Sequence, residues 1–244
     1  MKKHAFPEQL IPIVLQTHDR LQNCFSSRRT INVLIHALYK SYGRYIKRYL
    51  NYDAIAEPFN QEFFFKNYVK ALLFFYIIHG FGFDLVEDFF DVGSGATPGG
   101  IAYSQIRKEL GYGGTTIRLL DKSKVQLGLA KKYCTKNEVH IDQIQKQTFQ
   151  IREINQDSMV FFSYFVCEQG RGFIKDLYKH RDCFKHGFAV VDYQQNVERI
   201  ERVFQRSGCY RICPVYRCFC LPESLQEVIH ENEIFVNGCF YEPR

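Results

Sequence analysis

A chain of 244 residues can bury the core of one medium domain with an extension, or of one large domain. Its longest apolar run, residues 71–78, is far too short to cross a bilayer, which excludes a membrane-spanning helix there. The net charge of +6 comes from residues 1–80, where Lys+Arg number 11 and Asp+Glu number 5 (11 − 5 = +6), while the remainder carries 21 of each. This basic front part either binds an anionic partner, such as RNA, a nucleotide or a modified peptide, or is simply a solvated helical face.

The front part of the chain predicts helices. Residues 28–49 place apolar and tyrosine side chains on one stripe, flanked by lysine and arginine. This helix either turns its basic side chains to a substrate or, as the single stripe favours, covers the rest of the protein as an amphipathic cap. Pro58 interrupts the helical pattern, and residues 63–79 resume it. We therefore divide the chain into a helical extension over residues 1–82 and an α/β body over residues 83–244.

A glycine-rich loop opens the body. Residues 89–92 predict a buried strand, and the glycines from Gly93 to Gly100 lead from it into a helix. Glycine lets a backbone approach a ligand closely, and a helix N-terminus offers N–H groups to an anion. The loop is one residue too long for the dinucleotide fingerprint, which disfavours a dinucleotide oxidoreductase. An ordinary strand-to-helix turn is the alternative.

Asp91 stands two positions before the first glycine of this loop. The resulting D-x-G-x-G pattern, followed by Pro-Gly, resembles motif I of the Rossmann-like, class I S-adenosylmethionine (SAM)-dependent methyltransferases. The resemblance implies that this segment holds the amino-acid end of SAM. The residues it assigns to the cofactor here are Asp91, Gly93, Ser94, Gly95, Pro98 and Gly99.

A second acid follows the next predicted strand, residues 115–120. Asp121 can accept hydrogen bonds from both ribose hydroxyls, which is the role that the resemblance implies for it, and Lys122 beside it joins the predicted cofactor contacts. Asp121 can also cap the helix that follows. The third strand lies within either residues 139–144 or residues 148–154, so the adenine contact stays open.

Residues 158–166 predict a strong buried strand, followed by Cys167 and Glu168. This stretch resembles motif IV of the same superfamily, and its form is similar to that of the methyltransferase-like family that associates with the small ribosomal subunit. The resemblance implies that Ser163 or Tyr164 lines the pocket between cofactor and acceptor, with Ser163 counted among the cofactor-binding residues, and that Glu168 orients a nucleophile or acts as a base. Alternatively, Tyr164 belongs to the core and Glu168 caps the next helix.

The rest of the chain continues the alternation of helices and strands. Helices are predicted over residues 172–186 and 197–206, and strands over residues 187–193, 209–221 and 233–241. Such alternation indicates an α/β fold with a Rossmann-like, doubly wound and mostly parallel sheet. The resembling superfamily inserts an antiparallel strand at the final pair.

The nine cysteines are scattered, and the first residues lack the apolar core of a signal peptide. We therefore expect reduced thiols in a cytoplasmic protein. Four cysteines crowd into the predicted strand 209–221, but their spacing lacks the C-x-x-C pairs of metal sites, so we predict buried thiols and no metal. These are Cys209, Cys213, Cys218 and Cys220.

The function that the sequence predicts is a SAM-dependent transferase, with Tyr164 and Glu168 as the catalytic residues. Methyl transfer to a nucleotide, RNA, a peptide or a small metabolite is the first hypothesis. Transfer of the 3-amino-3-carboxypropyl group of SAM is an alternative on the same fold. A non-catalytic RNA- or ribosome-binding protein is the alternative from another class, and the basic front part is its support. The acceptor and the oligomeric state are not predicted.

Overall fold

The computed structural model describes residues 67–80, 82–121, 124–145, 157–169, 172–204, 209–212, 219–220 and 238–243, with residues 4–5, 12, 151 and 154. The predicted helix 28–49 lies outside the described residues, and so does Lys122.

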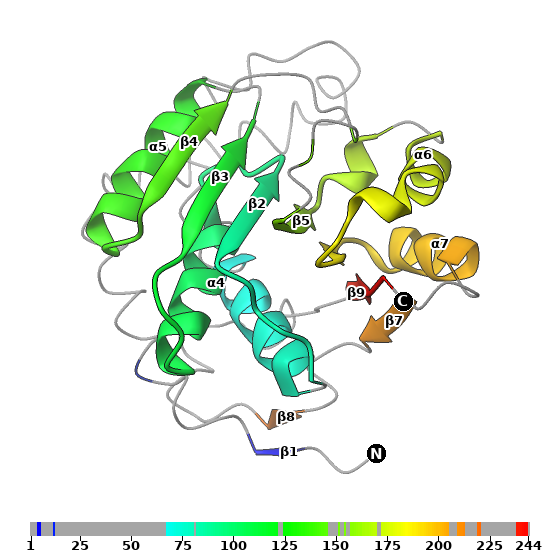
Figure 1. Cartoon of the computed structure of the whole chain (residues 1–244), viewed down its shortest axis with the longest axis horizontal. Helices are drawn as coiled ribbons and strands as arrows, with labels where there is room; N and C mark the ends of the chain where they lie inside the picture. Colours follow the sequence, from blue (N-terminus) through cyan, green and yellow to red (C-terminus); the bar gives the residue numbers. More distant parts are fainter. Residues whose placement is uncertain are drawn as a thin grey trace, which may run out of the picture.

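A seven-stranded sheet is the centre of the described structure (Figure 1). Its strands lie in the order β4-β3-β2-β5-β6-β9-β7. The pairs from β4 to β6 are parallel, whereas β9 is antiparallel to both of its neighbours. The strands are β2 (Asp88–Val92), β3 (Thr116–Leu120), β4 (Ile141–Gln145), β5 (Met159–Ser163), β6 (Phe188–Val191), β7 (Cys209–Ile212) and β9 (Gly238–Tyr241).

Helices cover both faces of this sheet, as a doubly wound fold requires. Side chains of α4, α5 and the helical residues 67–80 pack with one set of alternating strand residues, and side chains of α6 and α7 pack with the other set. In Figure 1, α6 and α7 lie on one side of the strands and α4 on the other. The helices are α4 (Pro98–Glu109), α5 (Lys124–Lys136), α6 (Phe173–Lys179) and α7 (Gln194–Phe204), with short 3-10 turns η2 (Val166–Glu168) and η3 (Arg181–Cys183).

The strand order reverses direction between β2 and β5. From β2 the chain moves outward through β3 and β4, and it then returns to place β5 on the opposite side of β2. In open α/β sheets, ligands bind beyond the carboxyl ends of the strands at such a switch point. The carboxyl ends of β2, β3, β5 and β6 therefore define the edge on which to look for a site.

The helical residues 67–80 belong to the core of the sheet. The buried ring of Phe75 lies 5.6 Å from that of Phe89, 5.0 Å from that of Tyr103 and 5.0 Å from that of Phe161, measured between centroids. This segment, which we assigned to the extension, shares one hydrophobic cluster with α4 and the strands. The division at residues 82 and 83 stays a prediction.

Three predicted elements differ from the structure. The strand predicted over 158–166 ends at Ser163, because Tyr164 takes a left-handed backbone conformation (φ 50°) and the chain then forms η2. The helix predicted over 172–186 is α6 followed by η3. Buried Val166 and Phe184 continue the apolar pattern past each true end, so periodicity alone missed both ends.

The strand predicted over 209–221 is also wrong as a single element. β7 lies in the large sheet, whereas β8 (Phe219–Cys220) pairs with β1 (His4–Ala5) in a separate two-stranded sheet. Of the two ranges predicted for the third strand, 139–144 and 148–154, the first is confirmed, because β4 lies within it except for Gln145. In the part of the chain that the structure describes, no helix is long and apolar enough to cross a bilayer.

Candidate cofactor-binding site

The glycine loop is fastened to the carboxyl end of β3. The backbone N–H groups of Gly93 and Ser94 both donate to the carbonyl oxygen of Leu120, at 2.8 and 3.1 Å. The N–H of Gly95 donates to Oδ2 of Asp121 at 2.9 Å. The two segments that the sequence predicted as cofactor contacts are thus joined directly, although 26 positions separate Gly95 from Asp121.

Asp91 connects the end of β2 to the start of α4. Its Oδ2 accepts a hydrogen bond from Oγ1 of Thr97 at 2.8 Å and another from the N–H of Gly100 at 3.3 Å. The N–H groups of a first helical turn lack partners within the helix, so this carboxyl does the work of a capping side chain. Thr97 itself adopts a left-handed conformation (φ 56°) and makes no cap bond with its side chain.

Burial changes the acidity of Asp91. The side chain is 1% exposed, and burial raises the pKa of this carboxyl from 3.8 to about 7, against the lowering effect of the bonds from Thr97 and Gly100. Its other oxygen, Oδ1, is buried with no hydrogen-bond partner among the described residues. The buried Asp91 side chain therefore fixes the conformation of the loop through its hydrogen bonds. A direct contact of Asp91 with SAM stays a prediction.

Two glycines are required by close packing of the chain on itself. A Cβ at Gly99 would stand 2.4 Å from the Phe161 ring, and a Cβ at Gly93, where φ is +66°, would stand 2.4 Å from the Phe165 ring. Real Cβ atoms do not approach other atoms so closely, so a side chain at either place would displace an aromatic ring. Pro98 occupies the first helical position of α4, where it needs no N–H partner.

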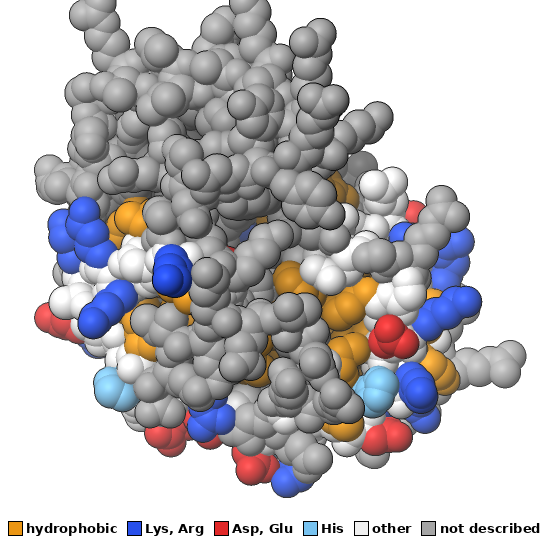
Figure 2. Space-filling view, turned by 90° about the horizontal axis from the view of Figure 1, so that it is seen from above, with side chains coloured by type: hydrophobic (Ala, Val, Ile, Leu, Met, Phe, Trp, Pro, Cys, Tyr) orange, Lys and Arg blue, Asp and Glu red, His pale blue; other side chains and the backbone are white. Residues whose placement is uncertain are grey.

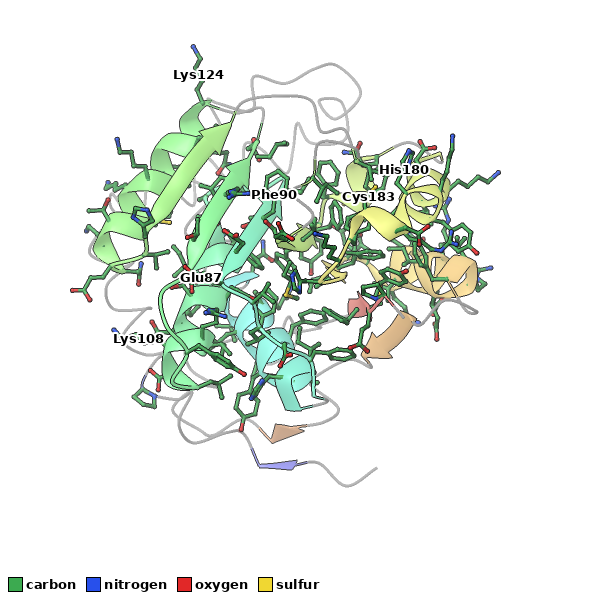
Figure 3. All side chains as sticks on the ribbon, viewed as in Figure 1. Glu87, Phe90, Lys108, Lys124, His180 and Cys183 are labelled. Carbon is green, nitrogen blue, oxygen red and sulfur yellow. The ribbon has the colours of Figure 1, made fainter. Side chains whose placement is uncertain are left out.

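The surroundings of Asp121 leave its carboxylate at the edge of the sheet. The residue is half-buried, and it follows β3 without interruption. Lys124, the first residue of α5, is exposed and points away from the strands (Figure 3). The Gly95–Asp121 bond joins this corner of the site together with the two bonds from Gly93 and Ser94 to Leu120.

The carboxyl end of β5 brings a second group of side chains to the same edge. Ser163 ends β5 and is half-buried, and Tyr164 follows it. The Tyr164 hydroxyl oxygen accepts a hydrogen bond from Nζ of Lys70 at 3.0 Å. Burial raises the pKa of Tyr164 well above its ordinary value of 10, so this phenol keeps its proton at neutral pH.

Asp192 follows the end of β6 and connects two turns at this edge. Its buried carboxylate accepts bonds from the N–H of Cys167 at 3.1 Å, the N–H of Tyr193 at 2.7 Å and the amide of Asn196 at 2.8 Å. Burial raises the pKa of this carboxyl. Asp192 thereby holds together the two turns that follow β5 and β6.

Sequence reasoning missed three of these residues. Asp192 ends a predicted strand as Asp91 and Asp121 do, and that shared position could have revealed it. Thr97 and Lys70 carry no such signal, since their partners lie on other elements. Of the predicted catalytic pair, Glu168 falls within η2, but its side chain is outside the description, so its role stays a prediction.

No metal site is found among the residues that the structure describes. Among the described residues, Cys134 and Cys183 are free thiols. Cys209 and Cys220 lie on strands of different sheets, whereas Cys213 and Cys218 are outside the described residues. What the four crowded cysteines bind, if anything, stays untested.

Figure 2 looks onto the molecule from the side to which β2, β3 and β4 point in Figure 1. Hydrophobic side chains are exposed near the centre of this view, and lysine and arginine side chains lie mainly toward its margins. Acidic side chains are interspersed with them. The described part of this surface therefore has no single-sign basic patch of the kind that dominates nucleic-acid binding.

Solved structures with the same fold have low sequence identity to this chain. A putative SAM-dependent methyltransferase from Methanococcus maripaludis superposes with a TM-score of 0.52 at 14% identity, covering 79% of this chain and 94% of that one. The YcgJ protein of Bacillus subtilis superposes with a TM-score of 0.45 at 10% identity, covering 71% and 98% of the two chains.

A tRNA (uracil-54, C5)-methyltransferase from Pyrococcus abyssi, solved with S-adenosyl-L-homocysteine, reaches a TM-score of 0.40 at 12% identity. The match covers 64% of this chain and 34% of that one, so this chain spans about a third of its length. No family model matches the sequence, and no curated protein matches it.

The strand order, the antiparallel β9 and the superposition on the Methanococcus structure show a Rossmann-like, mostly parallel α/β fold, which this chain shares with that putative SAM-dependent methyltransferase. At this identity the comparison shows the fold alone. The similarity of residues 162–168 to the family of the small ribosomal subunit finds no support in these comparisons.

Proposed function

We propose that this protein is a SAM-dependent methyltransferase that binds its cofactor at the carboxyl edge of β2 and β3. The observation that carries the proposal is the hydrogen bond from the Gly95 N–H to Asp121 at the switch point of the sheet. It joins a glycine loop to an acid at the end of the neighbouring strand. A ligand with a charged amino-acid end and a ribose needs both groups side by side.

The described residues fit such a ligand. A carboxylate has about four acceptor positions, so the bond that Asp121 receives from Gly95 is compatible with further bonds from a ribose diol. Gly95 has a left-handed backbone (φ +52°), and a Cβ there would meet no atom closer than the Gln126 side chain at 3.6 Å. Gly93, Ser94, Pro98 and Gly99 would shape the loop, and Lys122 stays a predicted contact.

In such an enzyme, SAM supplies a methyl group that its sulfonium has already activated. The task left to the protein is orientation and, for some acceptors, removal of a proton. Because Tyr164 stays protonated at neutral pH, we assign it a hydrogen-bonding role rather than that of a base. Glu168 remains the candidate base, and Ser163 remains a predicted residue between cofactor and acceptor.

Calorimetry with SAM tests the cofactor site. We expect wild-type protein to bind SAM with a micromolar-range Kd, and Asp121→Ala to weaken binding by at least roughly tenfold through loss of the ribose contacts. Asp121→Asn keeps one acceptor for Gly95 but loses the charge, so it should fall between the two. Glu109→Gln, an exposed change at the far end of α4, is the matched control and should bind as the wild type does.

The outcomes separate the three candidate functions. Binding by the wild type, with S-adenosylhomocysteine as the product on a suitable acceptor, supports methyl transfer. Methylthioadenosine as the product would indicate 3-amino-3-carboxypropyl transfer instead. Absence of SAM binding by the wild type would overturn the proposal and favour a protein that binds RNA through its basic front part, with an affinity that falls steeply as salt rises.

A further inference from the structure

Tyr164 is held in an unusual backbone conformation at the edge of the site. Its φ of 50° lies in the left-handed region, which is unfavourable for a bulky residue. The surrounding structure enforces it: the Tyr164 N–H donates to the carbonyl of Val191 at 2.8 Å, and the Cys167 thiol donates to the Tyr164 carbonyl at 2.9 Å. Such enforced outliers cluster at ligand-binding positions, so the direction of this side chain needs an explanation.

The explanation lies in the partner that the conformation selects. Nζ of Lys70, from the helical residues 67–80, donates to the Tyr164 hydroxyl oxygen and lies 5.2 Å from the centroid of its ring. Both side chains are half-buried. A contact between residues 94 positions apart thus brings one positive charge to the end of β5.

Tyr164 has a donor for a ligand, and the charge of Lys70 lies beside it. The Tyr164 oxygen is an acceptor toward Lys70, so the phenol retains its own O–H for donation to another oxygen. Hydrogen bonds that involve an ionised partner are shorter and roughly twice as strong as neutral ones, and partial burial strengthens them further. The arrangement suits a carboxylate or a phosphate.

The pair lies on the acceptor side of the proposed cofactor site. Register places Val92 of β2 beside Phe162 of β5, so the glycine loop and Tyr164 leave neighbouring strands at nearly the same level. Tyr193, 57% exposed, stands edge-on to Tyr164 with ring centroids 5.4 Å apart. Its ring offers an apolar surface next to the charge.

We propose that Lys70 and Tyr164 bind an anionic oxygen group of the acceptor, and that Tyr193 packs against a planar ring beside that group. The acceptor class is therefore a ring compound that carries a carboxylate or a phosphate. The role of this ligand as a methyl acceptor rests on the proposed function. The existence of the anion-binding site does not. Lys70 and Tyr164 act here as binding residues.

The test uses three probes that share a phenyl ring: phenyl phosphate, benzoate and neutral phenol. NMR titrations of the full chain are made alone and with S-adenosylhomocysteine. We expect the better anion to bind wild-type protein at least roughly tenfold more tightly than phenol does. A preference for phenyl phosphate identifies the phosphate form of the acceptor, and a preference for benzoate identifies the carboxylate form.

Four variants distinguish a ligand-binding role of Lys70 and Tyr164 from a purely structural contact between the helical residues 67–80 and the sheet. Lys70→Met should remove the preference for the anion, Lys70→Arg should keep it, and Tyr164→Phe should reduce it several-fold. Tyr193→Ala should weaken all three probes by a similar factor. A purely structural role would lower the melting temperature of these variants without changing the ratio between anion and phenol.

The proposal is overturned if wild-type protein binds neither anion better than phenol, or if folded Lys70→Met keeps the preference. If Lys70→Met does not fold, Tyr164→Phe, which removes one atom, decides the question alone. SAM binding is measured on the same samples. A Lys70-dependent anion site in a protein that does not bind SAM would confirm the ligand site and overturn its role as an acceptor site, and the proposed function would then fail separately.

Discussion

Single residues at the carboxyl edge of this sheet each perform two tasks. Asp91 accepts bonds from Thr97 and Gly100, so the same carboxyl fixes a left-handed residue and caps α4. Asp121 holds the Gly95 amide while remaining half-buried at the edge. Because these bonds determine the shape of the loop, a substitution at either acid changes the site even where no ligand atom touches it.

The acidity of Asp91 gives a prediction at this scale. Its pKa of about 7 in the folded protein exceeds its ordinary value of 3.8, so the folded state retains a proton that the unfolded state has lost. The resulting stability is complete below pH 3.8 and is lost as the pH rises through about 7. The free energy of unfolding of the wild type, measured in urea relative to Asp91→Asn, should therefore fall across this range by up to about 1.4 kcal/mol per pH unit.

Asp157→Asn is the control for that measurement. Asp157 is exposed, and its hydrogen bond and ion pair with Lys185 lower its pKa. A group with a lowered pKa contributes stability above its unfolded pKa and loses that stability as the pH falls. The two variants should therefore show pH dependences of opposite sign, and a flat difference between wild type and Asp91→Asn would contradict the first expectation.

At the scale of elements, α4 lies close against the sheet because two residues of its first turn, Gly99 and Gly100, have no side chains. A Cβ at Gly100 would stand 2.4 Å from Oγ1 of Thr97 and 3.1 Å from Ile117, and Gly99 faces Phe161 in the same way. The glycines that predict a ligand loop thus also set the distance between helix and sheet. The packing role of these glycines is compatible with a cofactor role, because both require the loop backbone to lie close to β2.

Gly99→Ala tests this packing. We expect the added methyl group to destabilise the protein by about 1–3 kcal/mol, because the Phe161 ring must move. Gly128→Ala is the matched control: Gly128 is exposed within α5, a Cβ there would meet nothing within 4 Å, and alanine should be neutral or stabilise by up to about 1 kcal/mol. Urea unfolding of both variants measures the difference, and equal stabilities would show that α4 can shift freely.

At the scale of the whole molecule, β9 closes the sheet. It lies between β6 and β7 and is antiparallel to both, so the four residues of β9 connect two parts of the sheet that would otherwise be separate. Its side chains Phe240, Cys239 and Tyr241 are buried among both hydrophobic clusters. A strand inserted from the end of the chain makes the entire fold depend on its C-terminal residues.

Deletion of residues 238–244 should therefore prevent folding. The edges of β6 and β7 would lose their partner, and unpaired strand edges favour aggregation. Deletion of residues 242–244, which follow β9, is the control and should leave a folded protein. Circular dichroism and size-exclusion chromatography measure both. A monomeric, cooperatively folded protein after the longer deletion would show that β9 is dispensable.

The sequence predicted the elements better than their ends. Strands β2, β3, β5 and β6 and the helices α4, α5 and α7 all lie where the alternation of patterns indicates, because buried parallel strands produce apolar runs and surface helices produce 3.6-residue stripes. The ends of β5 and α6 were wrong, since Tyr164 and His180 leave the regular backbone while buried Val166 and Phe184 continue the apolar pattern beyond them. The periodicity of apolar residues reports which residues are buried, and buried residues continue past the end of a strand or helix.

By itself, the sequence determined that an acid and a glycine loop follow one strand and that a second acid follows the next, because those relations span only a few neighbouring residues. Only the tertiary structure decided that Gly95 binds Asp121, that Asp91 caps α4, and that Lys70 meets Tyr164. These contacts depend on strand order and on a helix that packs from elsewhere in the chain. The spacing of residues along the sequence does not show which of them come into contact. The folded sheet determines these contacts.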